Sequence, residues 1–242
     1  MPEITLLVET ADLRHALTAV APFTQPKIDT LARVSVRAGE HFTTVSATNG
    51  HAAALAVVST LHLGIDVLSD DTVAVFDLSS DDARKILQVF KGKAGKDDEP
   101  GEELRIEVDS ESVTLTDASG MFEGQQLVLP RTPMIEHAPN VHNYLGQYIH
   151  RRPRSPEGAE VPLFGPNVAL FVGACKVYDT QMTLELHGSS DRLAKGVTLV
   201  RIGSSFIGAL TITPWDEETA ETEGRRRKTW THRISPALTA VP

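Results

Sequence analysis

The chain has 242 residues, of which 41% are hydrophobic and 23% are charged, an ordinary globular composition with room for one large domain or two small ones. Its 32 acidic residues outnumber its 23 Lys and Arg residues, so the net charge of −9 excludes binding of nucleic acid by bulk charge and requires that any such contact use cations gathered on one face. The single cysteine, Cys175, excludes an internal disulfide and a multi-cysteine metal site, and favours a reducing compartment. The N-terminal segment contains Glu3 and only a short apolar run, so we expect no signal peptide, no membrane span and a cytoplasmic location.

The first part of the chain predicts a strand, a helix and three further strands. The helix, about 11–21, has Thr10 as a plausible N-cap and apolar residues at helical spacing, and Pro22 ends it. The predicted strands are 4–8, 32–37, 42–47 and 52–60.

The same order of elements follows a second time. A strand over 72–78 leads to a helix over 79–91, which Ser79 or Ser80 caps and whose first turn contains Asp81 and Asp82. After a charged loop at 92–101, the remaining predicted strands are 104–108, 112–116 and 125–129. The chain therefore predicts an internal structural repeat with little sequence identity.

A third, shorter unit follows a stretch at 130–160 that is rich in Pro, His and Arg. Within that stretch, the sequence does not decide whether residues 140–149 form a helix. The third unit has a short strand at 161–164 and a helix in which Pro166 takes the first position and residues 167–178 follow. Its remaining predicted strands are 182–186, 197–202 and 206–212.

The residues after Trp215 change in composition. Residues 216–223 are acidic and residues 225–228 are basic. We expect 216–242 to be a charged tail that becomes ordered only when it docks. The basic run either binds nucleic acid or pairs with the acidic stretch before it.

One phrase, Ala47-Thr48-Asn49-Gly50-His51, resembles the Ala-Thr-Asp-Gly-His hairpin of bacterial replicative sliding clamps, the beta subunit of the replicative polymerase. Asn49 stands where the family has Asp. Asn-Gly also tolerates positive φ at both turn positions, which suits a tight hairpin. The order of the predicted units resembles the clamp over residues 3–215. The resemblance implies an α+β DNA-clamp (processivity) fold of antiparallel sheets with helices packed on one face and repeated units. The expected parts are a domain at 1–136, a shortened domain at 137–215 and the tail at 216–242.

The resemblance also implies a function without enzymatic activity or cofactor. A clamp-like chain would self-associate around double-stranded DNA and tether a DNA polymerase by a short peptide. The expected DNA-facing cations are Arg14, Arg84, Lys85, Lys91, Lys93 and Lys96. The expected peptide pocket uses Thr48, Gly50 and His51 with Pro214 and Trp215. The plainer alternatives are solvated helix faces, an ordinary hairpin and a buried Trp.

Two other readings stay open. The first is a clamp-fold adaptor that does not encircle DNA and acts through protein contacts. The second is an enzyme of unrecognised class, which only Cys175 and the histidines His137, His142 and His150 suggest. The spacing of these histidines fits no zinc motif, Cys175 lies on an apolar predicted helix, and standard catalytic motifs are absent from the sequence.

Overall fold

The computed structural model describes residues 3–65, 73–92, 101–122, 124–150, 162–187, 196–212 and 216–238. The first unit comprises β1 (Ile4–Glu9), α1 (Thr10–Val20), the short 3-10 helix η1 (Ala21–Phe23), β2 (Arg33–Gly39), β3 (Phe42–Thr48) and β4 (Ala52–Ile65). The second comprises β5 (Val73–Ser79), α2 (Ser80–Val89), β6 (Glu103–Val108), β7 (Ser112–Asp117) and β8 (Gln126–Pro130). The third comprises α3 (Val141–Ile149), α4 (Gly165–Tyr178), β9 (Met182–His187), β10 (Gly196–Ile202) and β11 (Phe206–Ile212), and α5 (Glu217–Leu238) follows.

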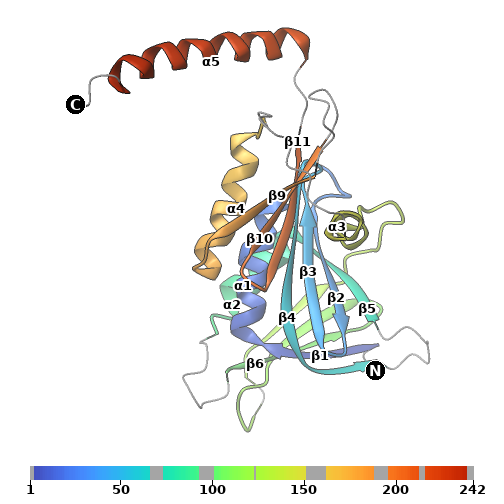
Figure 1. Cartoon of the computed structure of the whole chain (residues 1–242). Helices are drawn as coiled ribbons and strands as arrows, with labels where there is room; N and C mark the ends of the chain where they lie inside the picture. The colour runs from blue at the N-terminus through green and yellow to red at the C-terminus, as the bar shows by residue number, and fades with distance from the viewer. Residues whose placement is uncertain are drawn as a thin grey trace.

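The strands form one connected antiparallel system, as the predicted fold class requires. Eight of them follow the order β5-β2-β3-β4-β1-β6-β7-β8, and β11, β10 and β9 continue from β4. Helices α1, α2 and α4 lie together on one side of the sheets, whereas α3 lies on the other side (Figure 1). The helix left open near 140–149 is therefore present and covers the opposite face.

Strand β4 connects the first and third units. On one side of β4, residues 53–59 pair with β3. On the other side, residues 52–56 pair with β11 and residues 60–65 pair with β1. Because side chains alternate along a strand, both faces of β4 are buried: Ala54 belongs to the main core beneath α1 and α4, and Ala53 belongs to a smaller core beneath α3. This double burial explains the continuous apolar run of the strand.

The helix starts show how local chemistry sets the boundaries. Ser79 caps α2 as predicted, because its hydroxyl accepts a hydrogen bond from the Asp82 backbone N–H at 3.0 Å. Thr10 was expected to cap α1, but it is the first helical residue, and Glu9 precedes it without a side-chain cap.

One predicted feature of the third unit is wrong. Residues 162–164 are irregular rather than a strand, and Val161 lies outside the described residues. Pro162 has no N–H to donate to a sheet, and the Phe164 carbonyl already accepts the Asn167 N–H at the start of α4. In the stretch expected to be a charged tail, residues 217–238 form the helix α5, and its ordering by docking stays a prediction. The Asp216 carboxylate caps that helix, accepting the Thr219 N–H at 2.8 Å.

The contact between β11, β4 and α4 leaves no room for a side chain at Gly208. A Cβ atom there would lie 2.5 Å from Phe171 Cε1 and 2.6 Å from the Ala53 carbonyl oxygen. Gly208 pairs with Ala54 in the sheet, so this close approach lies where the third unit joins the first. The predicted boundary at residues 136 and 137 stays a prediction, since α4 and β11 share the main core with α1.

We expect Gly208→Ala to lower the free energy of unfolding by about 2 kcal/mol, because backbone and a buried ring must move to admit the methyl group. The matched control is Gly173→Ala on α4, where an added Cβ meets nothing within 4 Å. That change should raise stability by roughly 0.5–1 kcal/mol through helix propensity. Urea denaturation of both variants checks this. Equal stabilities would contradict the tight junction.

Candidate functional site

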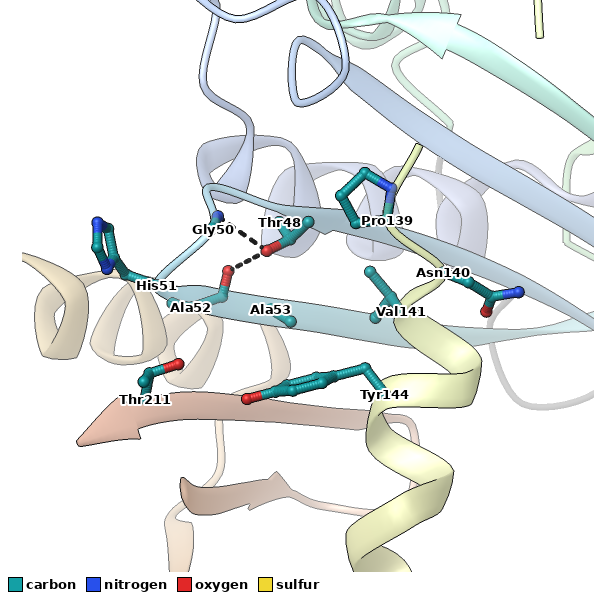
Figure 2. Close-up of a pocket in the computed structure, with 10 residues that line it drawn as sticks. All are labelled: Thr48, Gly50, His51, Ala52, Ala53, Pro139, Asn140, Val141, Tyr144 and Thr211. Atoms are coloured by element: carbon teal, nitrogen blue, oxygen red, sulfur yellow. Dashed lines mark hydrogen bonds between the residues drawn. The ribbon is translucent and has the colours of Figure 1, made fainter. Parts of the chain in front are cut away.

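A pocket of about 400 Å³ opens where three segments distant in sequence meet. Figure 2 shows its walls: the β3–β4 hairpin, the start of α3, and the end of β11. The lining residues are Thr48, Gly50, His51, Ala52, Ala53, Pro139, Asn140, Val141, Tyr144 and Thr211. Three residues predicted to bind a peptide, Thr48, Gly50 and His51, therefore lie together. Pro214 and Trp215 lie outside the described residues.

The hairpin that forms one wall is held by side-chain hydrogen bonds. The Asn49 Oδ1 atom accepts the backbone N–H groups of His51 at 2.9 Å and Ala52 at 2.7 Å. The Thr48 hydroxyl donates to the Ala52 carbonyl at 2.8 Å and accepts the Gly50 N–H at 3.0 Å. Only Gly50 in this turn has a positive φ, 87°, so Asn49 does not adopt the left-handed conformation that Asn tolerates. The amide side chain of Asn49 closes the turn instead.

Asn49 also links the hairpin to α4. Its Nδ2 group donates a hydrogen bond to Asn167 Oδ1 at 3.2 Å, and Asn167 is buried. The substitution of Asn for the Asp of the family phrase thus supplies an amide donor that a carboxylate lacks. The hairpin is consequently fixed against both the sheet and the helix layer.

Helix α3 forms the apolar wall of the pocket. Asn140 caps it by accepting the Asn143 N–H at 2.9 Å, and Val141 and Leu145 are buried against Ala53 and Leu55. The ring of Tyr144 lies across the pocket toward Thr211 (Figure 2). Burial raises the pKa of the Tyr144 phenol, so the hydroxyl stays protonated at neutral pH.

The segment before α3 is anchored by a buried ion pair. The Arg33 Nη1 group donates to Asp77 Oδ2 at 2.6 Å and to the Pro133 carbonyl at 3.0 Å. Both side chains of the pair are about nine-tenths buried, with 10% and 9% exposure. Asp77 also forms a backbone bridge with Thr132. These contacts fix the path of the chain from β8 to the pocket.

The pocket residues contributed by α3 and β11 were not predicted from the sequence. A signal for α3 is present, because Asn140 is a good N-cap and Val141, Tyr144, Leu145 and Tyr148 have the i, i+3, i+4, i+7 spacing of an apolar helix face. No local pattern indicates that this face packs on β4, because that contact joins residues about ninety positions apart in the sequence.

The cations expected to face DNA have mixed surroundings. Arg14 is half-buried, and its guanidinium donates to the carbonyls of Leu87, at 2.7 Å, and Phe90 at the end of α2. Arg84 and Lys85 are exposed on α2 and form ion pairs with Asp81 at 2.8 Å and Asp82 at 2.7 Å.

The hydrogen bond to Asp82 raises the pKa of Lys85, so this cation stays fully charged at neutral pH. Lys91 is exposed just beyond α2. Lys93 and Lys96 lie outside the described residues.

The other side chains considered in the sequence lie apart from one another. His142 Nε2 and Thr44 Oγ1 form a hydrogen bond of 2.8 Å, His137 and His150 are exposed, and Cys175 is partly buried against the main core. Within the described ranges, no group of three His, Cys, Asp or Glu residues is placed to hold a metal ion. None of the helices described here is both long and apolar enough to cross a bilayer.

Comparison with known proteins identifies the fold. No family profile and no curated protein matches the sequence. A DNA polymerase sliding clamp from Pseudomonas aeruginosa superposes with a TM-score of 0.58 at 11% identity, over 89% of this chain and 68% of that one. The sliding clamp (DNA polymerase III subunit beta) from Bartonella birtlesii, bound to griselimycin, gives 0.56 at 11% identity over 90% and 67%. The DNA polymerase III beta chain from Streptococcus pneumoniae gives 0.54 at 12% identity over 88% and 66%.

These similarities confirm the predicted fold class, an α+β sliding-clamp fold with a curved antiparallel sheet. At such low identity they concern the fold alone. The chain spans about two thirds of the length of each of these clamps.

The position of His142 on α3 predicts a pH dependence of the pocket wall. Burial, and then the charge of Arg37, lowers the pKa of His142 below its ordinary value of 6.5. The unfolded chain therefore binds the proton more readily, and stability falls as the pH drops through about 6.5 toward the lower folded pKa.

We expect His142→Gln, which can still hydrogen-bond with Thr44, to reduce the loss of stability between pH 7.5 and pH 5.5. Urea denaturation at both pH values measures this. His137→Gln, at an exposed position, is the control and should keep the wild-type difference. An unchanged difference in His142→Gln would refute the assignment.

Proposed function

We propose that the chain is a sliding-clamp-like processivity factor that self-associates around duplex DNA and tethers a DNA polymerase through a peptide held in the pocket. The observation that carries the proposal is the meeting of the Thr48–His51 hairpin with the end of β11 in one pocket. The resemblance in the sequence assigns peptide binding to this pair of segments, and the clamp fold supports the same arrangement.

The chemistry of the pocket suits an apolar peptide side chain. Ala52, Ala53, Val141 and Tyr144 supply carbon surface, and the Tyr144 hydroxyl and the Thr211 side chain supply polar partners at one end. Tyr144 is half-buried, and an aromatic residue beside small apolar ones is the usual composition of an anchoring pocket in a protein interface. The hydrogen-bonded hairpin gives the peptide a preformed surface, which lowers the entropic cost of binding.

The helix layer is the proposed DNA-facing surface. Arg84, Lys85 and Lys91 are exposed there. The ion pair between Arg84 and Asp81 joins two exposed side chains, so it is weak enough for a phosphate group to compete with Asp81, whereas Lys85 is paired with the buried Asp82. Contacts of this kind are independent of base sequence and weaken with salt, as sliding requires.

The pairing of the cations in the same helix layer favours the alternative, a clamp-fold adaptor that does not encircle DNA. Arg14 is engaged by carbonyls of α2, and two further cations are paired, so the surface holds little uncompensated positive charge. The solution mass separates the two proposals. Light scattering over a dilution series gives a stable trimer or tetramer for a ring and a monomer at all concentrations for the adaptor.

We expect Tyr144→Ala to weaken binding of a fluorescein-labelled clamp-binding peptide from a bacterial polymerase by at least tenfold, since truncation of a central aromatic residue costs about 2 kcal/mol or more. Fluorescence anisotropy measures the affinity. Tyr148→Ala is the matched control, because Tyr148 lies one turn later on α3 and does not line the pocket. Equal loss in both variants would remove the pocket assignment.

Encirclement is tested by closing DNA through a bound ring. The protein is mixed with linear duplex DNA, the ends are ligated, and the circles are washed at high salt, which removes purely electrostatic binding. A ring stays on the circle and is released when a restriction enzyme cuts it. We expect Arg84→Glu with Lys85→Glu to lower the retained protein about fivefold. Retention unaffected by these changes would rule out α2 as the DNA-facing helix.

A further inference from the structure

We propose that α5 is a separate DNA-binding arm whose basic half enters a groove of duplex DNA. This goes beyond the proposed function, because it requires neither a ring nor the peptide pocket. It starts from a concentration of charge: five of the 23 Lys and Arg residues of this acidic chain lie within residues 225–233, and residues 224–242 contain no Asp or Glu. An acidic chain can contact nucleic acid only where its cations are gathered, and they are densest on α5.

The arm is accessible from all sides. In Figure 1, α5 extends away from the sheets and from the other helices. The side chains of Arg225 to Lys228 are all exposed, and Trp230 is 59% exposed. At 1.5 Å per residue, the basic stretch 225–233 is roughly 13 Å long.

The distribution of the cations around the helix favours a groove over a flat surface. Successive residues of an α-helix are about 100° apart, so the four consecutive cations Arg225–Lys228 surround the helix instead of lining one face. A membrane or a flat protein surface would contact only part of this circumference. The major groove of duplex DNA, about 12 Å wide, admits a helix and places phosphates on both of its flanks.

The neighbouring side chains fit the same partner. Thr229 and Trp230 follow the four cations, and Arg233 lies over the Trp230 ring with 5.4 Å from its Cζ atom to the ring centroid. Trp230 is the only large apolar side chain among residues 224–233, so this basic stretch lacks the broad apolar face by which helices bind membranes. Hydroxyl, indole N–H and guanidinium groups are all donors to phosphate oxygen.

The helix itself is stabilised from within. Besides the cap at Asp216, Arg226 forms an ion pair with Glu223, and Arg225 donates to the Thr222 hydroxyl at 3.2 Å. Lys228 forms neither a hydrogen bond nor an ion pair with the residues that the structure describes. The contacts of Arg225 and Arg226 are made at the surface and leave the outer sides of these cations exposed.

The test uses the full chain and a fluorescein-labelled 24-base-pair linear duplex, with anisotropy measured at several salt concentrations. The variant is Arg225→Gln, Arg227→Gln and Lys228→Gln together, which retains the Glu223–Arg226 pair and uses a residue of good helix propensity. We expect affinity to fall at least tenfold and the slope of log K against log salt to decrease by about 2–3, near 0.9 for each lost phosphate contact.

A matched variant controls for charge alone. Arg227→Gln with Lys228→Gln removes two charges from α5 and should weaken binding. Lys27→Gln with Arg201→Gln removes two charges from exposed positions outside both α5 and the helix layer, and should leave affinity within twofold. Equal loss in this variant, or no loss in the α5 variant, would overturn the proposal. Flotation with phosphatidylcholine and phosphatidylserine vesicles supplies a further criterion, since binding to vesicles at protein concentrations that do not bind the duplex would also overturn it.

The outcome for the α5 arm can be distinguished from the outcome for the proposed clamp function. Loss of retention on closed circles together with intact binding of the short duplex would reject the ring and leave the arm. Normal retention and peptide binding with no effect of the α5 variant would reject the arm and leave the clamp. Quenching of Trp230 fluorescence by the duplex, absent in Trp230→Phe, places the contact on α5, and an unchanged emission in the wild type would count against it.

Discussion

The pairing of β4 with three strands is the constraint on which the rest of the molecule depends. Its first half lies between β3 and β11, and its second half pairs with β1. Such a strand must be apolar on both faces, which accounts for the small residues Ala52, Ala53 and Ala54 at the crowded junction. Small side chains let α1 and α3 approach the strand from opposite sides, and Gly208 on the neighbouring strand β11 lets Phe171 of α4 approach closely.

The elements that depend on near neighbours in sequence could be predicted well. The apolar spacing of α1, the Ser79 cap of α2 and the alternating strands each leave a local pattern, and the structure contains them at nearly the expected positions. Helix α3 left a weaker pattern within a stretch rich in Pro, His and Arg. The acidic and basic halves of α5 resemble a disordered tail in composition, although i, i+3 pairs and the Asp216 cap stabilise a helix.

The site could be predicted only in part for the same reason. Thr48, Gly50 and His51 belong to one recognisable phrase, so the resemblance brought them together. Val141 and Tyr144 reach the pocket because α3 packs on β4, and Thr211 reaches it because β11 pairs with β4. No local pattern specifies either long-range contact. The family phrase also did not reveal that Asn49 closes the turn with its side chain and reaches Asn167 on α4.

The pocket has a thermodynamic consequence that follows from its three walls. Residues 48–53, 139–144 and 211 are adjacent only when β11 is paired with β4 and α3 is packed on both. Any ligand bound there interacts with the docked arrangement and not with the open one, so it stabilises the docked state by RT ln(1 + [L]/Kd), about 2.7 kcal/mol at a ligand concentration one hundred times Kd. Binding in the pocket and association of the first and third units are therefore thermodynamically linked. A partner bound at the surface stabilises the contact between β4, β11 and α3 beneath it.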